Sequence, residues 1–187
     1  MDFRVPRALT ALALVAAAGV GLAQIIRLDL PQMVAQTDDA VLGTITASKV
    51  FRTDGEKDGQ VKELYFTTIT IDGRSLSNDQ PLKVDVTFGG GFLSPTEGSF
   101  NSEAPVADDV KVGNKVVAFF KHIDDMGNGL SGNVLYTWHG GLYRVFTQSG
   151  ASVVLGRGNG YALSRNWKLD ELDLEITRLK NQREGGK

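Results

Sequence analysis

Apolar and polar residues alternate along much of the chain in the period-2 pattern of β-strands. The pattern is clearest at 82–88, where four apolar residues alternate with polar ones, as in a strand with one buried face. Residues 41–48 repeat it, and residues 61–72 are rich in Thr, Ile and aromatic side chains, which favour strands. Three further strands are predicted at 134–138, 142–147 and 151–155, separated by turns that contain Gly.

One segment, Val116–Phe120, has no polar position at all, so we expect a strand that is buried on both faces. Helical spacing appears only near the two ends of this pattern. A short helix is predicted over 30–38, with Pro31 near its start, and a longer one over 169–181. Acidic residues begin the longer helix and basic residues end it, an order that complements the helix dipole.

Seven strands, mostly antiparallel because their turns are short, predict a mainly β fold: a small antiparallel β-barrel or sandwich. The short N-terminal helix precedes the strands and the C-terminal helix closes the chain. Because the closing helix carries an apolar stripe, it needs an apolar surface to cover. The open side of a barrel is the natural candidate.

The first 23 residues have the pattern of a secretory signal peptide. Arg4 and Arg7 precede an apolar run at 8–23, which ends in small residues suitable for a signal peptidase. An uncleaved anchor is the alternative, but the run is shorter than the ~20 residues that span a bilayer. We therefore expect an exported protein, periplasmic or extracellular, with no membrane span after cleavage and one domain over 24–187.

Composition removes several classes of chemistry. The 187-residue chain has no Cys, which excludes disulfides, thiolate nucleophiles and Cys-ligated metals. Its net charge of −2 makes whole-molecule attraction to nucleic acid weak. We expect no cofactor, and a folded core in place of disulfides.

Two short segments resemble a family of small exported bacterial domains. Residues 37–45 (TDDAVLGTI) resemble its opening AD-x-V-V-x-G-x-V, and residues 112–120 (VGNKVVAFF) resemble its VG-x-x-V-L-x-F strand. The arrangement is similar to OB-like barrels of the netrin and tissue-inhibitor type. The resemblance implies a fold; the zinc-chelating N-terminal Cys of the tissue inhibitors has no counterpart in this chain.

Charge is unevenly distributed, which suggests a ligand surface. Residues 24–125 carry ten Lys and Arg against sixteen Asp and Glu, whereas residues 126–169 carry four basic residues and no acid. Basic and aromatic side chains on a barrel suit sugars, anionic polymers or single strands. The candidate ligand residues are Arg144, Arg157, Arg165, Tyr143 and Tyr161. The alternative is that each Arg pairs with an acid of the other half or packs under the last helix.

Two histidines offer the only classical metal or acid–base chemistry. His122 follows the VVAFF strand close to two Asp residues, and His139 ends the predicted strand at 134–138. If these strands are neighbours, both rings could lie at one barrel end as a metal site or an acid–base pair. The alternative is two surface histidines at strand ends.

Two loops complete the list of candidates. Residues 127–132 fit GxGxxG, but a strand follows them where a dinucleotide site needs a helix, so we interpret them as a hairpin turn. Residues 89–107 form a long Gly-, Ser- and Pro-rich loop that contains Phe92, Leu93 and Phe100. Loops of this length are usually functional or disordered. These side chains either meet a partner or fold back to plug the barrel end.

Together these features predict an exported, non-enzymatic binding or interaction module of the bacterial cell envelope. Its ligand is unknown; an envelope protein or an anionic polymer would suit, and nucleic acid would not. One alternative is a small hydrolase or metal-dependent enzyme that uses His122 and His139. Another is a protease-inhibitor-like protein, which depends on the fold resemblance alone.

Overall fold

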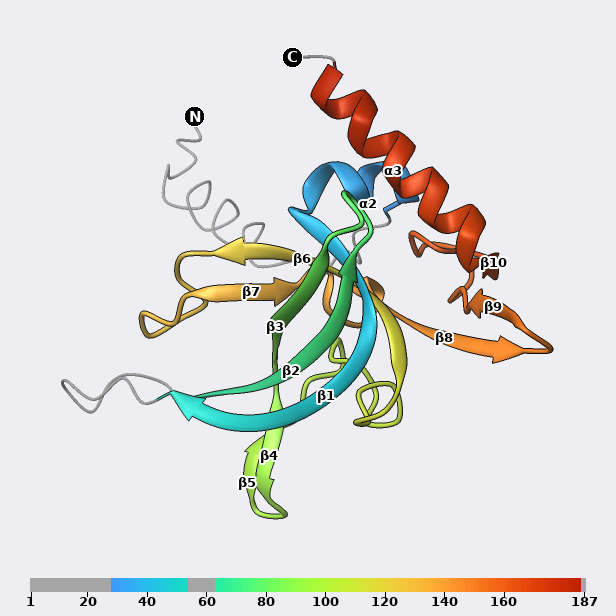
Figure 1. The fold of residues 1–187 in the computed structure, drawn as a ribbon. Coiled ribbons are helices and arrows are strands. Elements are labelled where there is room, and N and C mark those ends of the chain that lie inside the picture. The colour runs from blue at the N-terminus through green and yellow to red at the C-terminus, as the bar shows by residue number, and fades with distance from the viewer. Residues whose placement is uncertain (1–27, 54–62, 186–187) are drawn as a thin grey trace, which may run out of the picture.

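The computed structural model describes residues 28–53 and 63–185, and its fold is mainly β (Figure 1). The predicted signal peptide at 1–23 lies outside the described residues. The helical elements are α2 (Leu30–Gln36), η2 (Trp138–Gly141) and α3 (Leu169–Gly185). The strands are β1 (Asp39–Thr53), β2 (Leu64–Ser75), β3 (Pro81–Gly89), β4 (Gly91–Ser94), β5 (Glu97–Ser99), β6 (Lys115–Ile123), β7 (Gly132–Leu135), β8 (Leu142–Gln148), β9 (Ala151–Val154) and β10 (Trp167–Lys168).

Five strands close into a small barrel in the order β1-β2-β3-β7-β6, with β6 pairing back onto β1. The expected mainly β barrel with two flanking helices is confirmed. The expectation of antiparallel pairing is wrong at one seam, because β3 and β7 run parallel through Thr87 and Val134. The long connection from β3 to β6 allows this parallel pair, since parallel neighbours need a crossover. β8, β9 and β10 extend the sheet beyond the barrel.

The apolar residues of β1, β2 and β3 meet those of β6 inside the barrel. The alternation at 82–88 explains their placement, since Val84, Val86 and Phe88 all join this interior core while Lys83 and Asp85 face outward. The predicted strand at 82–88 is thus confirmed as the centre of β3.

Strand β6 separates two cores, as its lack of polar residues predicted. Val116 and Ala118 point into the barrel, whereas Val117 and Phe119 point to the opposite side. The second core lies outside the barrel and is built with residues of both helices, β8 and β9. The burial of Val116–Phe120 on both faces is therefore confirmed.

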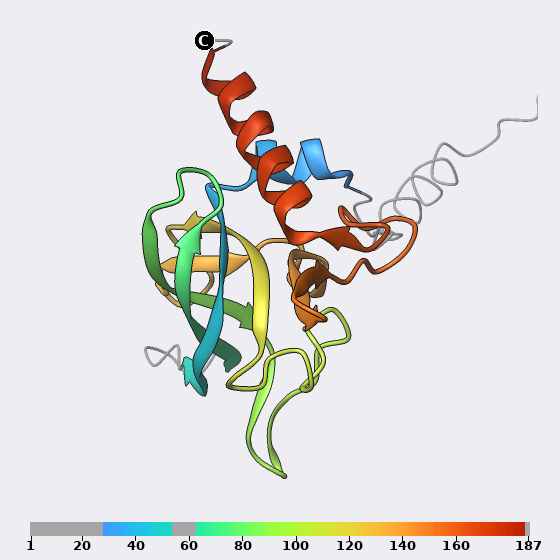
Figure 2. The same ribbon diagram turned by 45° about the vertical axis from the view of Figure 1, so that its right-hand side comes forward.

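Helix α3 covers this second core with Leu172 and Ile176, so it packs outside the barrel, against α2, β9 and β10, and not on the barrel interior. The start of α2 is capped by Asp29. The ammonium group of the buried Lys180 donates hydrogen bonds to the carbonyl oxygens of Thr37 (3.1 Å) and Asp38 (2.7 Å). These bonds satisfy carbonyl groups just beyond the end of α2. Figure 2 shows α3 beside α2 at one end of the barrel.

Two segments differ from the pattern-based prediction. The segment predicted as a loop over 89–107 contains a β-hairpin made of β4 and β5, in which Phe92 pairs with Gly98. The strand predicted at 134–138 ends at Leu135, because Thr137 and Trp138 both take left-handed backbone conformations, with φ of 49° and 52°. A left-handed pair of non-Gly residues has no clear sequence signal, since Gly is the usual occupant.

Candidate functional site

The β4–β5 hairpin projects from the end of the barrel away from α3 in both views (Figures 1 and 2). Its base is fixed by side chains of the barrel and of the returning chain. The buried Thr67 hydroxyl donates a hydrogen bond of 2.7 Å to the Gly90 carbonyl, and the Asn101 amide donates one of 2.9 Å to the Gly89 carbonyl. Arg52 of β1 contacts the Glu97 carboxylate at 3.0 Å. The hairpin is therefore a braced projection of the barrel.

Three large apolar side chains of this hairpin face solvent. The exposed fraction is 54% for Phe92, 46% for Leu93 and 81% for Phe100. The sequence was compatible with two roles for these side chains: they contact a partner, or they fold back and plug the end of the barrel. The structure places them outside the barrel, so they do not plug it.

Phe92 and Gly98 face the same side of the hairpin, because they pair directly across it. Phe100 follows directly after β5, where the chain leaves the hairpin. A Cβ on Gly98 would lie 2.7 Å from the Phe92 ring, so the bare glycine leaves room for that ring.

Trp138 extends the exposed aromatic surface at the base of the hairpin. Its ring lies against Gly89, where a Cβ would come within 3.1 Å of a ring carbon and within 3.5 Å of the Asn101 amide nitrogen. The side chain is 38% exposed. Left-handed backbone at non-Gly residues costs on the order of 1–3 kcal/mol each, and such conformations cluster at functional sites. The surrounding fold thus holds an indole ring beside the hairpin at an energetic cost.

His139 fixes the position of Glu103 next to Trp138. The His139 backbone N–H and ring Nδ1 both donate to the Glu103 carbonyl oxygen, at 2.9 and 2.8 Å. Because a carbonyl can only accept, Nδ1 carries a proton, and Nε2 shares a hydrogen bond of 2.8 Å with the Tyr161 hydroxyl. The Glu103 carboxylate stays exposed, with one oxygen 3.7 Å from Nδ1.

The two histidines have separate surroundings. His122 is exposed and lies 3.7 Å from Asp124 and 3.4 Å from Ser131, whereas the partners of His139 are Glu103 and Tyr161. Within residues 28–53 and 63–185, no group of three or more His, Asp or Glu side chains is arranged to hold a metal ion. The arrangement required by the enzyme alternative, both rings near one carboxylate, is not what these contacts show.

The structure divides the five candidate ligand residues of the basic stretch. Tyr143 is fully buried in the second core, packed edge-on against Phe119 with ring centroids 6.1 Å apart. Arg157 binds the Asp109 carboxylate at 2.7 Å and donates to the Leu142 carbonyl. Both residues therefore contribute to the interior of the fold, and Arg157 pairs with an acid of the other half of the chain, as the alternative expected.

Burial raises the pKa of the Tyr143 hydroxyl from its ordinary value of 10.0 to about 12. The folded protein therefore retains this proton to higher pH than the unfolded chain does. The resulting stabilisation is complete below pH 10 and is lost as the pH rises toward 12. We expect the free energy of unfolding to fall by about 2–3 kcal/mol over this range through Tyr143 alone. Urea unfolding at several pH values should show a shallower decline for Tyr143→Phe; equal declines in the two proteins would contradict the assignment.

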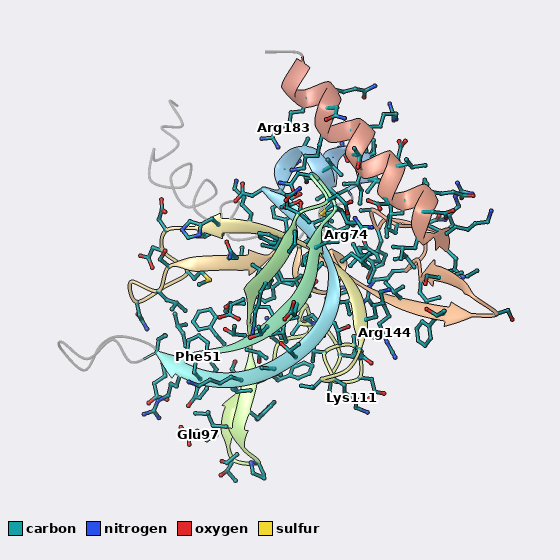
Figure 3. All side chains as sticks on the ribbon, viewed as in Figure 1. Phe51, Arg74, Glu97, Lys111, Arg144 and Arg183 are labelled. Atoms are coloured by element: carbon teal, nitrogen blue, oxygen red, sulfur yellow. The ribbon has the colours of Figure 1, made fainter. Side chains whose placement is uncertain are left out.

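Arg144 and Arg165 remain at the surface, each stacked on an aromatic ring. The Arg144 guanidinium lies 4.5 Å from the centre of the Phe146 ring and donates to Asn114, and that of Arg165 lies 4.8 Å from the centre of the Trp167 ring. Tyr161, the fifth candidate, is bonded to His139 at the hairpin base. Figure 3 shows Arg144 below β8 and well separated from Glu97 on the hairpin.

The chain matches no known family model, and comparisons with the curated proteins and with the solved structures found no significant match. The family named by resemblance is therefore supported only at the level of a small five-stranded mixed barrel. Among the described residues, no helix is both long and apolar enough to cross a membrane.

Three residues of this surface have little signal in the sequence. Trp138 falls within the strand predicted at 134–138, and Glu97 and Glu103 stand out only as part of the acidic charge of residues 24–125. One signal was present: residues 84–110 contain five acidic residues and no Lys or Arg, so the hairpin lies in the longest cation-free part of the acidic half.

Proposed function

We propose that the protein is an exported binding module of the bacterial cell envelope, and that it docks a partner protein through the β4–β5 hairpin. The observation that supports this most is the exposure of Phe92, Leu93 and Phe100 on one braced projection. Clustered exposed apolar side chains mark interaction sites, whereas single ones are ordinary.

The hairpin also meets the energetic requirement of a docking element. Binding is costly when the interface must first be ordered, and an anchored ribbon with stiff aromatic side chains lowers that cost. Phe and Trp side chains are enriched at the centres of interfaces because they bury much area with few rotatable bonds. A hairpin that projects from the barrel can enter a groove of the partner that the barrel itself could not reach.

A photo-crosslinking amino acid placed at Leu93 in the producing cell tests this proposal. We expect one discrete crosslinked product, which disappears when Phe92 and Phe100 are both replaced by Ser. Because both rings are exposed, this double substitution should change the free energy of unfolding by no more than about 0.5 kcal/mol per site. Unfolding curves of the variant check that expectation.

Leu174 provides the matched control, because it is 73% exposed and belongs to α3, which lies at the end of the molecule away from the hairpin (Figure 1). A crosslinker at Leu174 should give no such product. Equal products from both positions, or a Leu93 product that persists after the double substitution, would show that the hairpin is not a docking element. If the crosslinked partner is a protease and the protein inhibits it, the result would support the protease-inhibitor alternative.

A further inference from the structure

We propose that the partner segment bound by the hairpin is cationic, with Arg or Lys side chains that lie over the exposed aromatic rings. This inference rests on the proposed docking role and adds the chemistry of the partner. The surface concerned, called here the hairpin surface, consists of Phe92, Leu93, Phe100, Trp138, Glu97 and Glu103.

The charge of the hairpin surface has one sign. Residues 84–110 contain Asp85, Glu97, Glu103, Asp108 and Asp109 and no Lys or Arg. Arg52 reaches the hairpin from β1 and contacts Glu97, but Glu103 has an exposed carboxylate whose nearest basic atom in the described chain is His139 Nδ1 at 3.7 Å. Asp108 and Asp109 are paired with Lys111 and Arg157, so the charge that the hairpin surface offers to a partner is mainly that of Glu103. An anionic partner would meet this carboxylate with no Lys or Arg of the hairpin to offset it.

Aromatic rings beside carboxylates favour a positive charge for two independent reasons. The face of an aromatic ring is negative, so a guanidinium or ammonium group above Trp138 or Phe100 is attracted to it. A carboxylate nearby adds a charge-assisted hydrogen bond or ion pair. The chain already contains cation–π contacts of this kind, where Arg144 lies over Phe146 and Arg165 over Trp167.

The partner charge that this surface favours is opposite to the ligand charge predicted from the distribution of charged residues. The acid-free stretch at 126–169 suggested an anionic ligand, but Tyr143 and Arg157 of that stretch are committed to the fold. Phe92, Leu93 and Phe100 lie instead in residues 84–110, which contain no Lys or Arg, and of the hairpin surface only Trp138 comes from the acid-free stretch. Charge complementarity therefore points to a basic protein segment with apolar residues between its charges.

A set of matched synthetic peptides tests the inference directly. One alternates Arg with Leu; in the others, citrulline or Glu replaces every Arg. Nitrogen-15 NMR of the protein should show the Arg peptide shifting the Trp138 indole signal and the backbone amides of residues 91–103. The citrulline peptide should bind at least about threefold more weakly, the size expected for losing one exposed cation–π or ion-pair contact. The Glu peptide should not bind.

Glu103→Gln and Asp124→Asn form a matched pair of variants, since each carboxylate lies 3.7 Å from a His ring nitrogen and each substitution removes one charge. Glu103→Gln should lower the affinity for the Arg peptide about threefold, whereas Asp124→Asn should leave that affinity unchanged. Raising NaCl from about 0.05 M to about 0.3 M should also weaken binding, because exposed charges are screened.

The inference is overturned if the Arg and citrulline peptides bind equally, if both variants lose affinity equally, or if the shifted signals lie away from the hairpin surface. In each case a crosslinked product from Leu93 would still support the docking role. Loss of that product together with retained Arg-peptide binding would instead reject the docking role and leave only a cation-binding surface.

Discussion

Replacing Phe119 with Ala is expected to lower the free energy of unfolding by about 3–5 kcal/mol, the usual cost of removing a buried Phe side chain. Phe119 has no exposed surface, packs edge-on against Tyr143 and belongs to the core shared by β6, β8 and the two helices. The loss is a large share of the ~5–15 kcal/mol that holds a domain together. Chemical denaturation followed by circular dichroism measures it.

Phe100→Ala is the control for this substitution, because the same atoms are removed from a side chain that is almost wholly in solvent. We expect its unfolding free energy to stay within about 0.5 kcal/mol of the parent. If the two variants were equally stable, the core between β6 and the helices would not be a main source of stability.

Gly73→Ala is expected to destabilise the barrel by about 3 kcal/mol or more, at the upper end of what overpacking costs. Gly43 and Gly73 are directly paired in the antiparallel ladder of β1 and β2, and a Cβ on Gly73 would lie 2.0 Å from the Leu42 carbonyl oxygen. The obstacle is backbone, which cannot rotate away as a side chain would. The two strands must therefore separate, and the barrel cannot keep its present closure.

Gly185→Ala near the end of α3 adds the same methyl group where no other atom lies within 4 Å. Its melting temperature should equal that of the parent or exceed it slightly, since Ala favours helix. An unchanged melting temperature in Gly73→Ala would mean that β1 and β2 can move apart at little cost.

The strands of the barrel were predictable because their patterns are local. Alternation at 82–88 and the apolar run Val116–Phe120 each specify a buried face without reference to the rest of the chain. Which strand pairs with which cannot be predicted from such local patterns. The parallel pairing of β3 with β7 depends on a four-residue strand far along the sequence, and no alternation pattern specifies it.

The predicted ligand surface of five Arg and Tyr residues does not form, and strand geometry explains part of this. Tyr143 and Arg144 are consecutive residues of β8, and neighbouring residues of a strand face opposite sides. Tyr143 accordingly enters the second core with Val145, while Arg144 faces solvent and stacks on Phe146. Strand periodicity already contained this information. By contrast, the left-handed conformation of Trp138 and the bonds from His139 to Glu103 arise only from tertiary contacts.

The contact between the two helices has a consequence for synthesis. Lys180 reaches Thr37 across 143 positions of sequence, and the second core joins Leu30 of α2 to Ile176 of α3. A growing chain therefore leaves one side of the second core open until residues 169–185 have been made. A nascent or prematurely terminated product that stops before residue 169 should be recognised as unfinished by chaperones and proteases, because the apolar side chains that Leu172 and Ile176 cover stay exposed.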